Sequence, residues 1–124
     1  MSDILYKGES YMIIGKCMEV HNQLGWGFSE VVYKDALEYE FNAANIFFER
    51  EKKYPVTYKK IILPHFFYAD FVIMNKIILE VKAVKKLTDE HTALAINYCA
   101  VSQNKLALLV NFGREKLDYK RIVV

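Results

Sequence analysis

The sequence predicts an α/β fold in which a mixed β-sheet is flanked by helices. Two amphipathic helical patterns open the chain, aromatic and β-branched segments follow, and a third helical pattern separates these from a last apolar strand. A chain that leaves three strands and returns through a helix to a fourth builds a mixed sheet. The 124 residues suffice for one hydrophobic core, so we expect a single domain over 1–124.

Two helices are expected before the β-rich part of the chain. Ser10 can cap the first helix, which runs to about Leu24, where a Gly-Trp-Gly sequence ends it. Ser29 caps the second helix, which runs to about Ala44 with Asn45 as its C-cap. Apolar residues recur at helical spacing in both, so each helix should bury one face.

Three strands, a helix and further strands are expected after Ile46. The turns between the first three strands fall at 59–60 and around Asn75, which makes these strands an antiparallel meander. Pro64 cannot donate to a sheet ladder, so it marks an edge or a bulge. Thr88 begins the third helix, and the apolar run LALLVNF predicts a central strand, followed by a short edge strand in the polar tail.

Net charge, apolar runs and cysteine positions bear on the partners and the location expected for this protein. Seventeen Lys and Arg against fifteen Asp and Glu give a net charge of +2, which by itself is no argument for nucleic acid as a partner. No apolar run approaches the ~20 residues of a membrane-spanning helix, and the N-terminus lacks the pattern of a secretory signal. Cys17 and Cys99 fall in helical patterns and are expected as buried thiols, so a cytoplasmic location is expected.

Three charged residues interrupt strands that are otherwise apolar: Asp70, Glu80 and Lys82. Burying carboxylates among aliphatic side chains is costly unless a cation compensates them. A divalent cation such as Mg²⁺ or Mn²⁺ binds clustered oxygens, here from Asp70, Glu80 and the Val81 carbonyl. Lys82 shares a strand face with Glu80 and can orient or deprotonate a water. This arrangement suits hydrolysis of a phosphodiester, and without metal the two acids should raise each other's pKa.

The proposed pairing of the two acids places a condition on the turn around Asn75. A two-residue loop would set Asp70 opposite Val81, on the wrong face, whereas a three-residue loop at 74–76 sets Asp70 opposite Glu80. The site therefore predicts an odd-length loop or a bulge.

Asp70, nine residues and then Glu80-Val81-Lys82 resemble the D…ExK motif of the PD-(D/E)xK nuclease superfamily, whose restriction-endonuclease-like core has the order αβββαβ. The blocks IIGKCMEVHNQLGWGFSEVVYKDALEYE, YPVTYKK, YADFVI, ILEVKAVKKLT, INY and LLVNFG are similar to its small GxxExxR branch, from about Ile13 to Ile122. This resemblance implies a nuclease that uses Mg²⁺ or Mn²⁺ and acts on nucleic acid, with DNA favoured.

The resemblance also implies roles for particular residues. Asp70 and Glu80 match the metal ligands, Lys82 matches the catalytic lysine, and Glu30 matches the glutamate of the GxxE block, which can reach the metal or the water from its helix. The alternatives are a buried salt bridge for the strand residues and a first-turn acid that favours the helix dipole for Glu30.

Three positions depart from the pattern of these nucleases. Tyr33 stands where the branch carries arginine, Leu94 where a glutamine is common four residues before Tyr98, and Tyr68 where a basic residue is usual. Leu94 and Tyr68 favour the alternative of a nuclease fold without turnover that binds nucleic acid or a protein. A structural subunit that assembles through its Tyr and Phe side chains is a third interpretation.

Contacts with nucleic acid are expected beside the ExK strand. Lys85 and Lys86 follow it directly and can meet a phosphate backbone. Tyr98 is a candidate contact as well, with a core residue as the alternative. Since 124 residues offer little surface to grip a duplex, we expect a homodimer.

Overall fold

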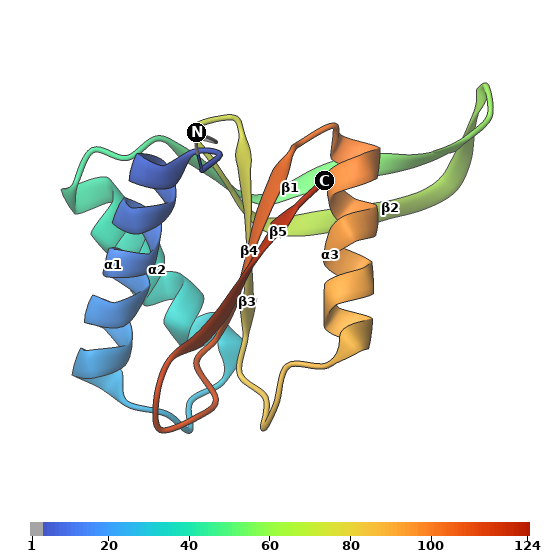
Figure 1. Ribbon diagram of the computed structural model, residues 1–124. Helices are drawn as coiled ribbons and strands as arrows, with labels where there is room; N and C mark the ends of the chain where they lie inside the picture. The colour runs from blue at the N-terminus through green and yellow to red at the C-terminus, as the bar shows by residue number, and fades with distance from the viewer. Residues whose placement is uncertain (1–3) are drawn as a thin grey trace.

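Five strands form one mixed sheet in the order β1-β2-β3-β4-β5, with α1 and α2 on one face and α3 on the other (Figure 1). The structure is a computed structural model that describes residues 4–124. The expected α/β fold is confirmed. In chain order the elements are α1 (Lys7–Leu24), α2 (Glu30–Ala43), β1 (Phe48–Tyr58), β2 (Ile61–Ile73), β3 (Ile77–Lys82), α3 (Asp89–Ser102), β4 (Leu106–Asn111) and β5 (Asp118–Val123).

The sheet is built as the element order predicts. β1, β2 and β3 pair antiparallel as a meander, α3 carries the chain across to β4, which pairs parallel with β3, and β5 pairs antiparallel with β4 at the edge. All six residues of β4 are buried, as expected for a strand covered on both faces. No described helix has the length and apolar character needed to cross a membrane.

Each face of the sheet has its own apolar core. The larger core lies under α1 and α2, where Tyr33 and Phe41 meet the odd-numbered residues of β3 and the even-numbered residues of β4. The smaller core lies under α3, around Ala95 and Cys99. Cys17 is buried in the first core, so both cysteines are buried free thiols, as expected.

The ends of α1 and α2 differ from the expected ones by a few residues. The helix start at Ser10 is wrong: α1 begins at Lys7, and Ser10 is buried inside its first turn, donating its N–H to the Tyr6 carbonyl at 2.8 Å. The extra turn lets Tyr6 pack against the larger core. Ser29 precedes α2 as expected, and Asn45, with a φ of 55°, lies one residue beyond its C-cap.

The outer parts of β1 and β2 continue as a two-stranded ribbon beyond the rest of the sheet (Figure 1). Tyr58 pairs with Ile61, which confirms the turn at 59–60. The register shifts between Pro55 and Thr57, so that residues 63–65 of β2 face one residue of β1. Pro64 therefore lies in a bulge, where its missing N–H leaves no ladder bond unmade.

A clamp from β4 fixes the chain just after β3. The Asn111 side chain accepts hydrogen bonds from the Val84 and Gly113 N–H groups, both at 3.0 Å, and donates to the Val84 carbonyl at 2.9 Å. The Phe112 N–H donates to the Lys82 carbonyl at 2.7 Å. The clamp sets the direction in which the chain leaves Lys82.

We expect Gly113→Ala to lower the free energy of unfolding by about 1–3 kcal/mol, as overpacking does. A Cβ at Gly113 would lie 2.4 Å from the Val84 N and O atoms, and backbone cannot give way as a flexible side chain can. The matched control is Gly15→Ala in α1, where a Cβ meets nothing within 4 Å and a better helix former should add up to ~1 kcal/mol. Urea unfolding measures both; an unchanged midpoint for Gly113→Ala would show that the clamp is loose.

Candidate active site

The candidate site lies where β2 and β3 separate. The ladder between these strands pairs Ile73 with Ile77, which leaves a three-residue turn at 74–76. This turn has the odd length that the sequence argument requires. With this register, Asp70 lies opposite Glu80, one position beyond the last paired residues.

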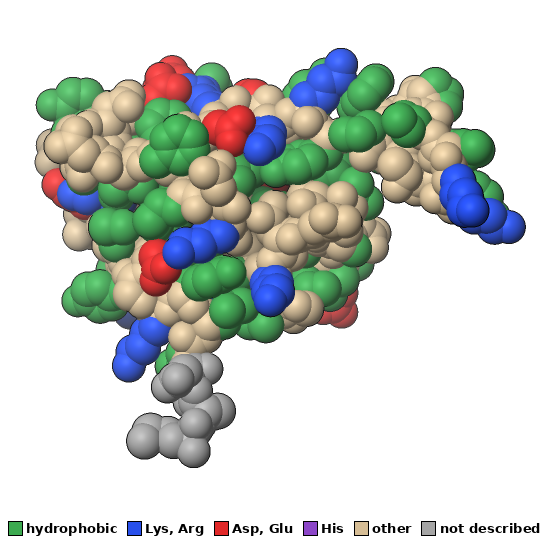
Figure 2. Space-filling model, turned by 90° about the horizontal axis from the view of Figure 1, so that it is seen from above, with side chains coloured by type: hydrophobic (Ala, Val, Ile, Leu, Met, Phe, Trp, Pro, Cys, Tyr) green, Lys and Arg blue, Asp and Glu red, His purple; other side chains and the backbone are tan. Residues whose placement is uncertain are grey.

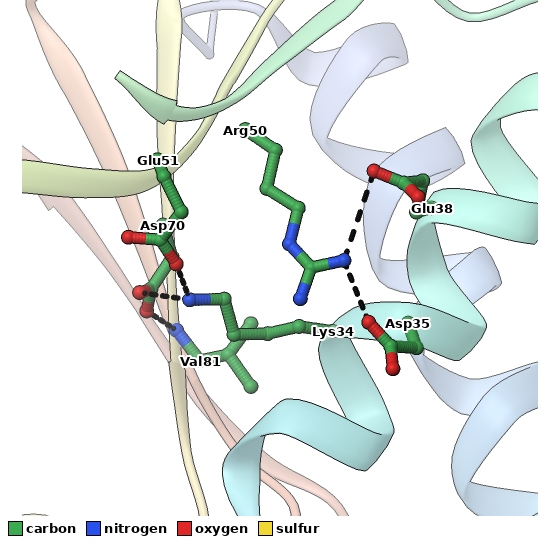
Figure 3. A network of polar contacts seen from close by, with 7 residues as sticks. All are labelled: Lys34, Asp35, Glu38, Arg50, Glu51, Asp70 and Val81. Atoms are coloured by element: carbon green, nitrogen blue, oxygen red, sulfur yellow. Dashed lines mark hydrogen bonds and ion pairs between the residues drawn. The ribbon is translucent and has the colours of Figure 1, made fainter. Parts of the chain in front are cut away.

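The Asp70 carboxylate fills the gap between the separating strands. Its Oδ2 accepts a hydrogen bond from the Val81 N–H at 2.8 Å (Figure 3). Its Oδ1 accepts from the Lys34 ammonium at 2.9 Å, and Lys34 also pairs with Glu51. Glu51 has a φ of 53° and lies between two paired residues of β1, so β1 is irregular opposite Asp70. A side chain therefore joins β2 to β3 where the backbone ladder stops.

Glu80 is buried on the face of the sheet that α3 covers. Its side chain is 6% exposed, and its Oε1 has no hydrogen-bond partner among residues 4–124. Burial, followed by the negative charge of Asp70, raises the pKa of Glu80 to about 9, although the Lys82 ammonium opposes the shift. The rise expected for neighbouring carboxylates is thus present at Glu80. Without a bound cation, Glu80 carries a proton at neutral pH.

Glu80 and Lys82 line one small hollow against α3, as expected for residues two apart on a strand. The hollow has a volume of about 10 Å³, roughly the space that one water fills. The hollow therefore brings Glu80, Lys82 and a water-sized space together. The remaining walls come from α3 and β4: His91, Leu94, Ala95, Tyr98 and Leu109.

A known protein family matches nearly the whole of the described chain. The sequence model of a family described as the PD-(D/E)XK nuclease superfamily matches residues 7–122. The chain belongs to the PD-(D/E)XK nuclease superfamily. The restriction-endonuclease-like core expected of that superfamily is what the sheet and helices form. The finer assignment to the GxxExxR branch stays a prediction.

A solved structure has a similar fold. The "Crystal structure of SSO0001" superposes with a TM-score of 0.60 over 95% of this chain, at 17% sequence identity. This chain spans 59% of that chain's length. At 17% identity, this similarity supports the fold of the present chain and does not extend to its activity or substrate. No curated protein sequence is significantly similar to this chain.

The departures from the nuclease pattern have structural consequences in this superfamily member. Tyr33 is fully buried, stacks on Phe112 at 4.7 Å and donates its hydroxyl hydrogen to the Gly25 carbonyl at 2.8 Å. Its stacked ring and its hydrogen bond hold the loop before α2 against the core. Leu94 borders the hollow with an apolar group, and Tyr68 is exposed on β2.

Lys34 is the residue of α2 that contacts Asp70. Among residues 4–124, Glu30 forms no hydrogen bond or ion pair with Asp70. Lys34 is 8% exposed and lies one helical turn after Glu30, which is partly exposed. Sequence reasoning missed Lys34, since a lysine beside an apolar stripe usually extends into solvent. Its position between Tyr33 and Leu37, both fully buried, is the signal that pointed to the sheet.

Tyr98 borders the site and packs within the smaller core. Its ring stacks on Phe67 with centroids 4.1 Å apart, and Phe67 stacks on Tyr54 at 5.1 Å. Burial and the charge of Glu80 raise the pKa of Tyr98. The stack favours the core interpretation of its ring, and a contact with nucleic acid stays a prediction.

Lys85 and Lys86 are exposed in the segment between β3 and α3. The Asn111 clamp holds the start of this segment, so both lysines follow the ExK strand at a fixed place on the surface. This position permits contact with phosphate, which stays a prediction.

The residues present fit one divalent cation with few protein ligands. Among the described residues there is no group of three or more His, Cys, Asp and Glu that could hold a metal ion. Asp70 and Glu80 supply two carboxylates, and Mg²⁺ often takes one or two and keeps several waters. The unpartnered Glu80 oxygen favours a cation at this place. The Lys34 ammonium on Asp70 is the group that such a cation would displace.

We expect Glu80→Gln to remove a pH dependence of stability. A glutamate with a pKa of 4.5 when unfolded and about 9 when folded keeps its proton only in the folded state between these values. Its contribution to stability is complete below pH 4.5 and is lost as pH rises through about 9. The variant, which has no titrating group there, should gain stability relative to the parent protein from about pH 5 to pH 9.

Urea unfolding in EDTA across that pH range measures the difference, with the exposed Glu115→Gln as the control. Parallel curves for Glu80→Gln and the parent protein would show that Glu80 ionises normally.

We expect Lys34→Met to destabilise the protein by about 3 kcal/mol without metal, because Asp70 loses its cation beside a second acid. Mn²⁺ should then raise the melting temperature of the variant more than that of the parent protein, since no ammonium competes for Asp70. Arg50→Met is the matched control, because Arg50 joins β1 to Asp35 and Glu38 of α2 without touching Asp70 (Figure 3). Equal Mn²⁺-induced shifts in all three proteins would separate Lys34 from the metal site.

Proposed function

We propose that this protein is a nuclease that hydrolyses phosphodiester bonds in nucleic acid, with DNA as the favoured substrate and Mg²⁺ or Mn²⁺ held by Asp70 and Glu80. The observation that supports the proposal most is the pair of opposed carboxylates between β2 and β3. One of them has a buried oxygen without a partner, and Lys82 lies on the same side. Membership of the superfamily supports a nuclease-like function.

The proposed reaction gives separate roles to the metal ligands, to Lys82 and to the exposed lysines. When bound, the cation would polarise the phosphate and lower the pKa of the attacking water. Asp70, Glu80 and the Val81 carbonyl would hold the cation. Glu80 would release its proton when the cation binds. Lys82 would orient the water and offset the negative charge that develops on the phosphate. Lys85 and Lys86 would neutralise flanking phosphates.

Glu30 has a supporting role in this proposal. Residues four apart on a helix are neighbours, so the Glu30 carboxylate lies one turn from the base of Lys34. Once Asp70 binds a cation, Lys34 keeps Glu51 as a partner and can turn toward Glu30. Glu30 would thereby draw the ammonium away from the metal site or contact the water itself, as the GxxE block implies.

The assembly and location are further parts of the proposal. A homodimer would extend the surface available to a duplex, and the buried free thiols suit a reducing compartment such as the cytoplasm. Light scattering at several concentrations tests the dimer.

A binding module without turnover is the second candidate. Leu94 places an apolar group at the hollow, and the Lys34 ammonium already neutralises Asp70. Calorimetry with Mn²⁺ distinguishes the two functions, because a metal-dependent nuclease must bind the ion and release the Glu80 proton. The absence of both heat and proton release would favour the binding module.

We expect the protein to nick plasmid or cleave single-stranded DNA in Mn²⁺ and to stop in EDTA. Asp70→Asn and Lys82→Ala should each lower the rate by about a hundredfold or more, because each removes charge at the reacting phosphate. Lys116→Ala, in the exposed loop between β4 and β5, is the matched control and should cleave normally. Cleavage that survives both site substitutions would end the assignment, and an RNA substrate of the same sequence tests the preference for DNA.

A further inference from the structure

The ribbon formed by the outer parts of β1 and β2, residues 52–69, is here named the arm. β3 pairs with β2 only at 71–73, so the arm has no third strand beside it. Figure 1 shows that it extends past α3, away from the rest of the protein. Unpaired strand edges of this length are usually covered, or protected by charged side chains and bulges, in stable monomers.

The excess of positive charge on this protein is concentrated in the arm. Residues 52–69 hold four lysines and no Asp or Glu: Lys52, Lys53, Lys59 and Lys60. Without these four, thirteen basic residues remain against fifteen acidic ones, so the rest of the chain carries a small negative charge. Figure 2 shows basic side chains at the tip of the projection and no acidic side chain along it. Such a local positive field attracts a polyanion even though the net charge is near zero.

Aromatic rings are exposed among these lysines. One face of the arm packs against α3 through Tyr54 and Phe67, whereas Phe66 and Tyr68 on the other face are 49% and 52% exposed. Lys53 is the cross-strand partner of Tyr68, and its ammonium lies 3.9 Å from the centre of the Phe66 ring. Exposed rings that alternate with ammonium groups are the pattern of surfaces that bind single-stranded nucleic acid, where bases stack and phosphates are neutralised.

The exposed face of the arm leads toward Asp70, the part of the candidate site that α2 contacts. Tyr68 precedes Asp70 by two residues on β2, which is roughly 7 Å along a strand. Lys53 follows Glu51 by two residues on β1, and Glu51 pairs with Lys34 at the site. A strand held on this face would therefore reach the Asp70 and Lys34 side of the fork between β2 and β3, whereas Glu80 and Lys82 line the hollow on the face that α3 covers.

We propose that the arm binds an unpaired nucleic-acid strand, with phosphates at Lys53, Lys59 and Lys60 and bases stacked on Phe66 and Tyr68, and leads it toward Asp70. The consequence for cleavage rests on the proposed function, since the bound strand would be the substrate. The arm contains no Arg, Asn or Gln, which most often read base edges, so binding is independent of base sequence. Contact between the arms of two copies would bring like charges together and is disfavoured.

Fluorescence anisotropy with a labelled oligothymidine, in EDTA so that no turnover occurs, tests the proposal on the full chain. Lys53→Gln/Lys59→Gln/Lys60→Gln should raise the Kd at least tenfold and reduce the slope of log K against log salt by about 2, since each lost phosphate contact removes about 0.7. Lys7→Gln/Lys105→Gln/Lys116→Gln removes the same charge from exposed positions outside the arm and should change the Kd less than twofold.

The stacking part of the proposal has its own variant. Phe66→Leu/Tyr68→Leu should raise the Kd about tenfold and leave the salt slope unchanged, because it removes rings and no charge. Circular dichroism and melting curves establish that each variant is folded. Equal affinity of the parent protein and both arm variants would overturn the inference. Tighter binding of a duplex of the same length, or loss of self-association in place of loss of binding, would overturn it as well.

Failure of this inference and failure of the proposed function give different results. Arm-dependent binding without cleavage by any variant in Mn²⁺ would leave the arm's role standing and refute the nuclease. Cleavage by the triple-lysine arm variant with an unchanged KM would leave the nuclease standing and refute the arm's role. Asp70→Asn should bind the oligonucleotide like the parent protein while losing cleavage, as both proposals together require.

Discussion

The hydrogen bond from the Val81 N–H to the Asp70 carboxylate is the interaction on which the site and the arm both depend. A carboxylate takes the place of a backbone partner at this point, so β2 stays attached to β3 while its backbone turns away. The same carboxylate is thereby held opposite Glu80 and within reach of Lys34. One side chain thus ends the ladder, positions the second acid and allows the outer parts of β1 and β2 to leave the sheet.

Charge balance at this point differs with and without a divalent cation. Without one, Lys34 neutralises Asp70, and Glu80 avoids a buried charge by keeping its proton. With a divalent cation bound, Asp70 would contact the cation in place of the Lys34 ammonium. Glu80 would then be ionised, because the cation compensates its charge. The ammonium and the proton therefore keep the fold stable when no metal is bound, at the expense of metal affinity. Such competition links metal binding to pH more steeply than an open pair of carboxylates would.

The features of this protein that could be predicted from sequence are those that show as hydrophobic periodicity or as charged residues within apolar strands. An acidic residue within an apolar strand stands out from the pattern around it, and this located Asp70 and Glu80. The alternation of side chains along paired strands then predicted the three-residue turn. Lys34 was not predictable in this way, because a long side chain on a helix can point to solvent or to the sheet with the same spacing. The Asn111 clamp also escaped, since a polar residue at a strand end has many possible partners before the loops are placed.

In the proposed enzyme, Asp70 and Glu80 together hold one divalent cation. Crystals grown without metal and then soaked in MnCl₂ test it most directly, by anomalous difference density at the manganese absorption edge. One peak should appear between the two carboxylates, with the Lys34 ammonium displaced from Asp70. A map without such a peak at saturating Mn²⁺, with Lys34 still bonded to Asp70, would contradict it.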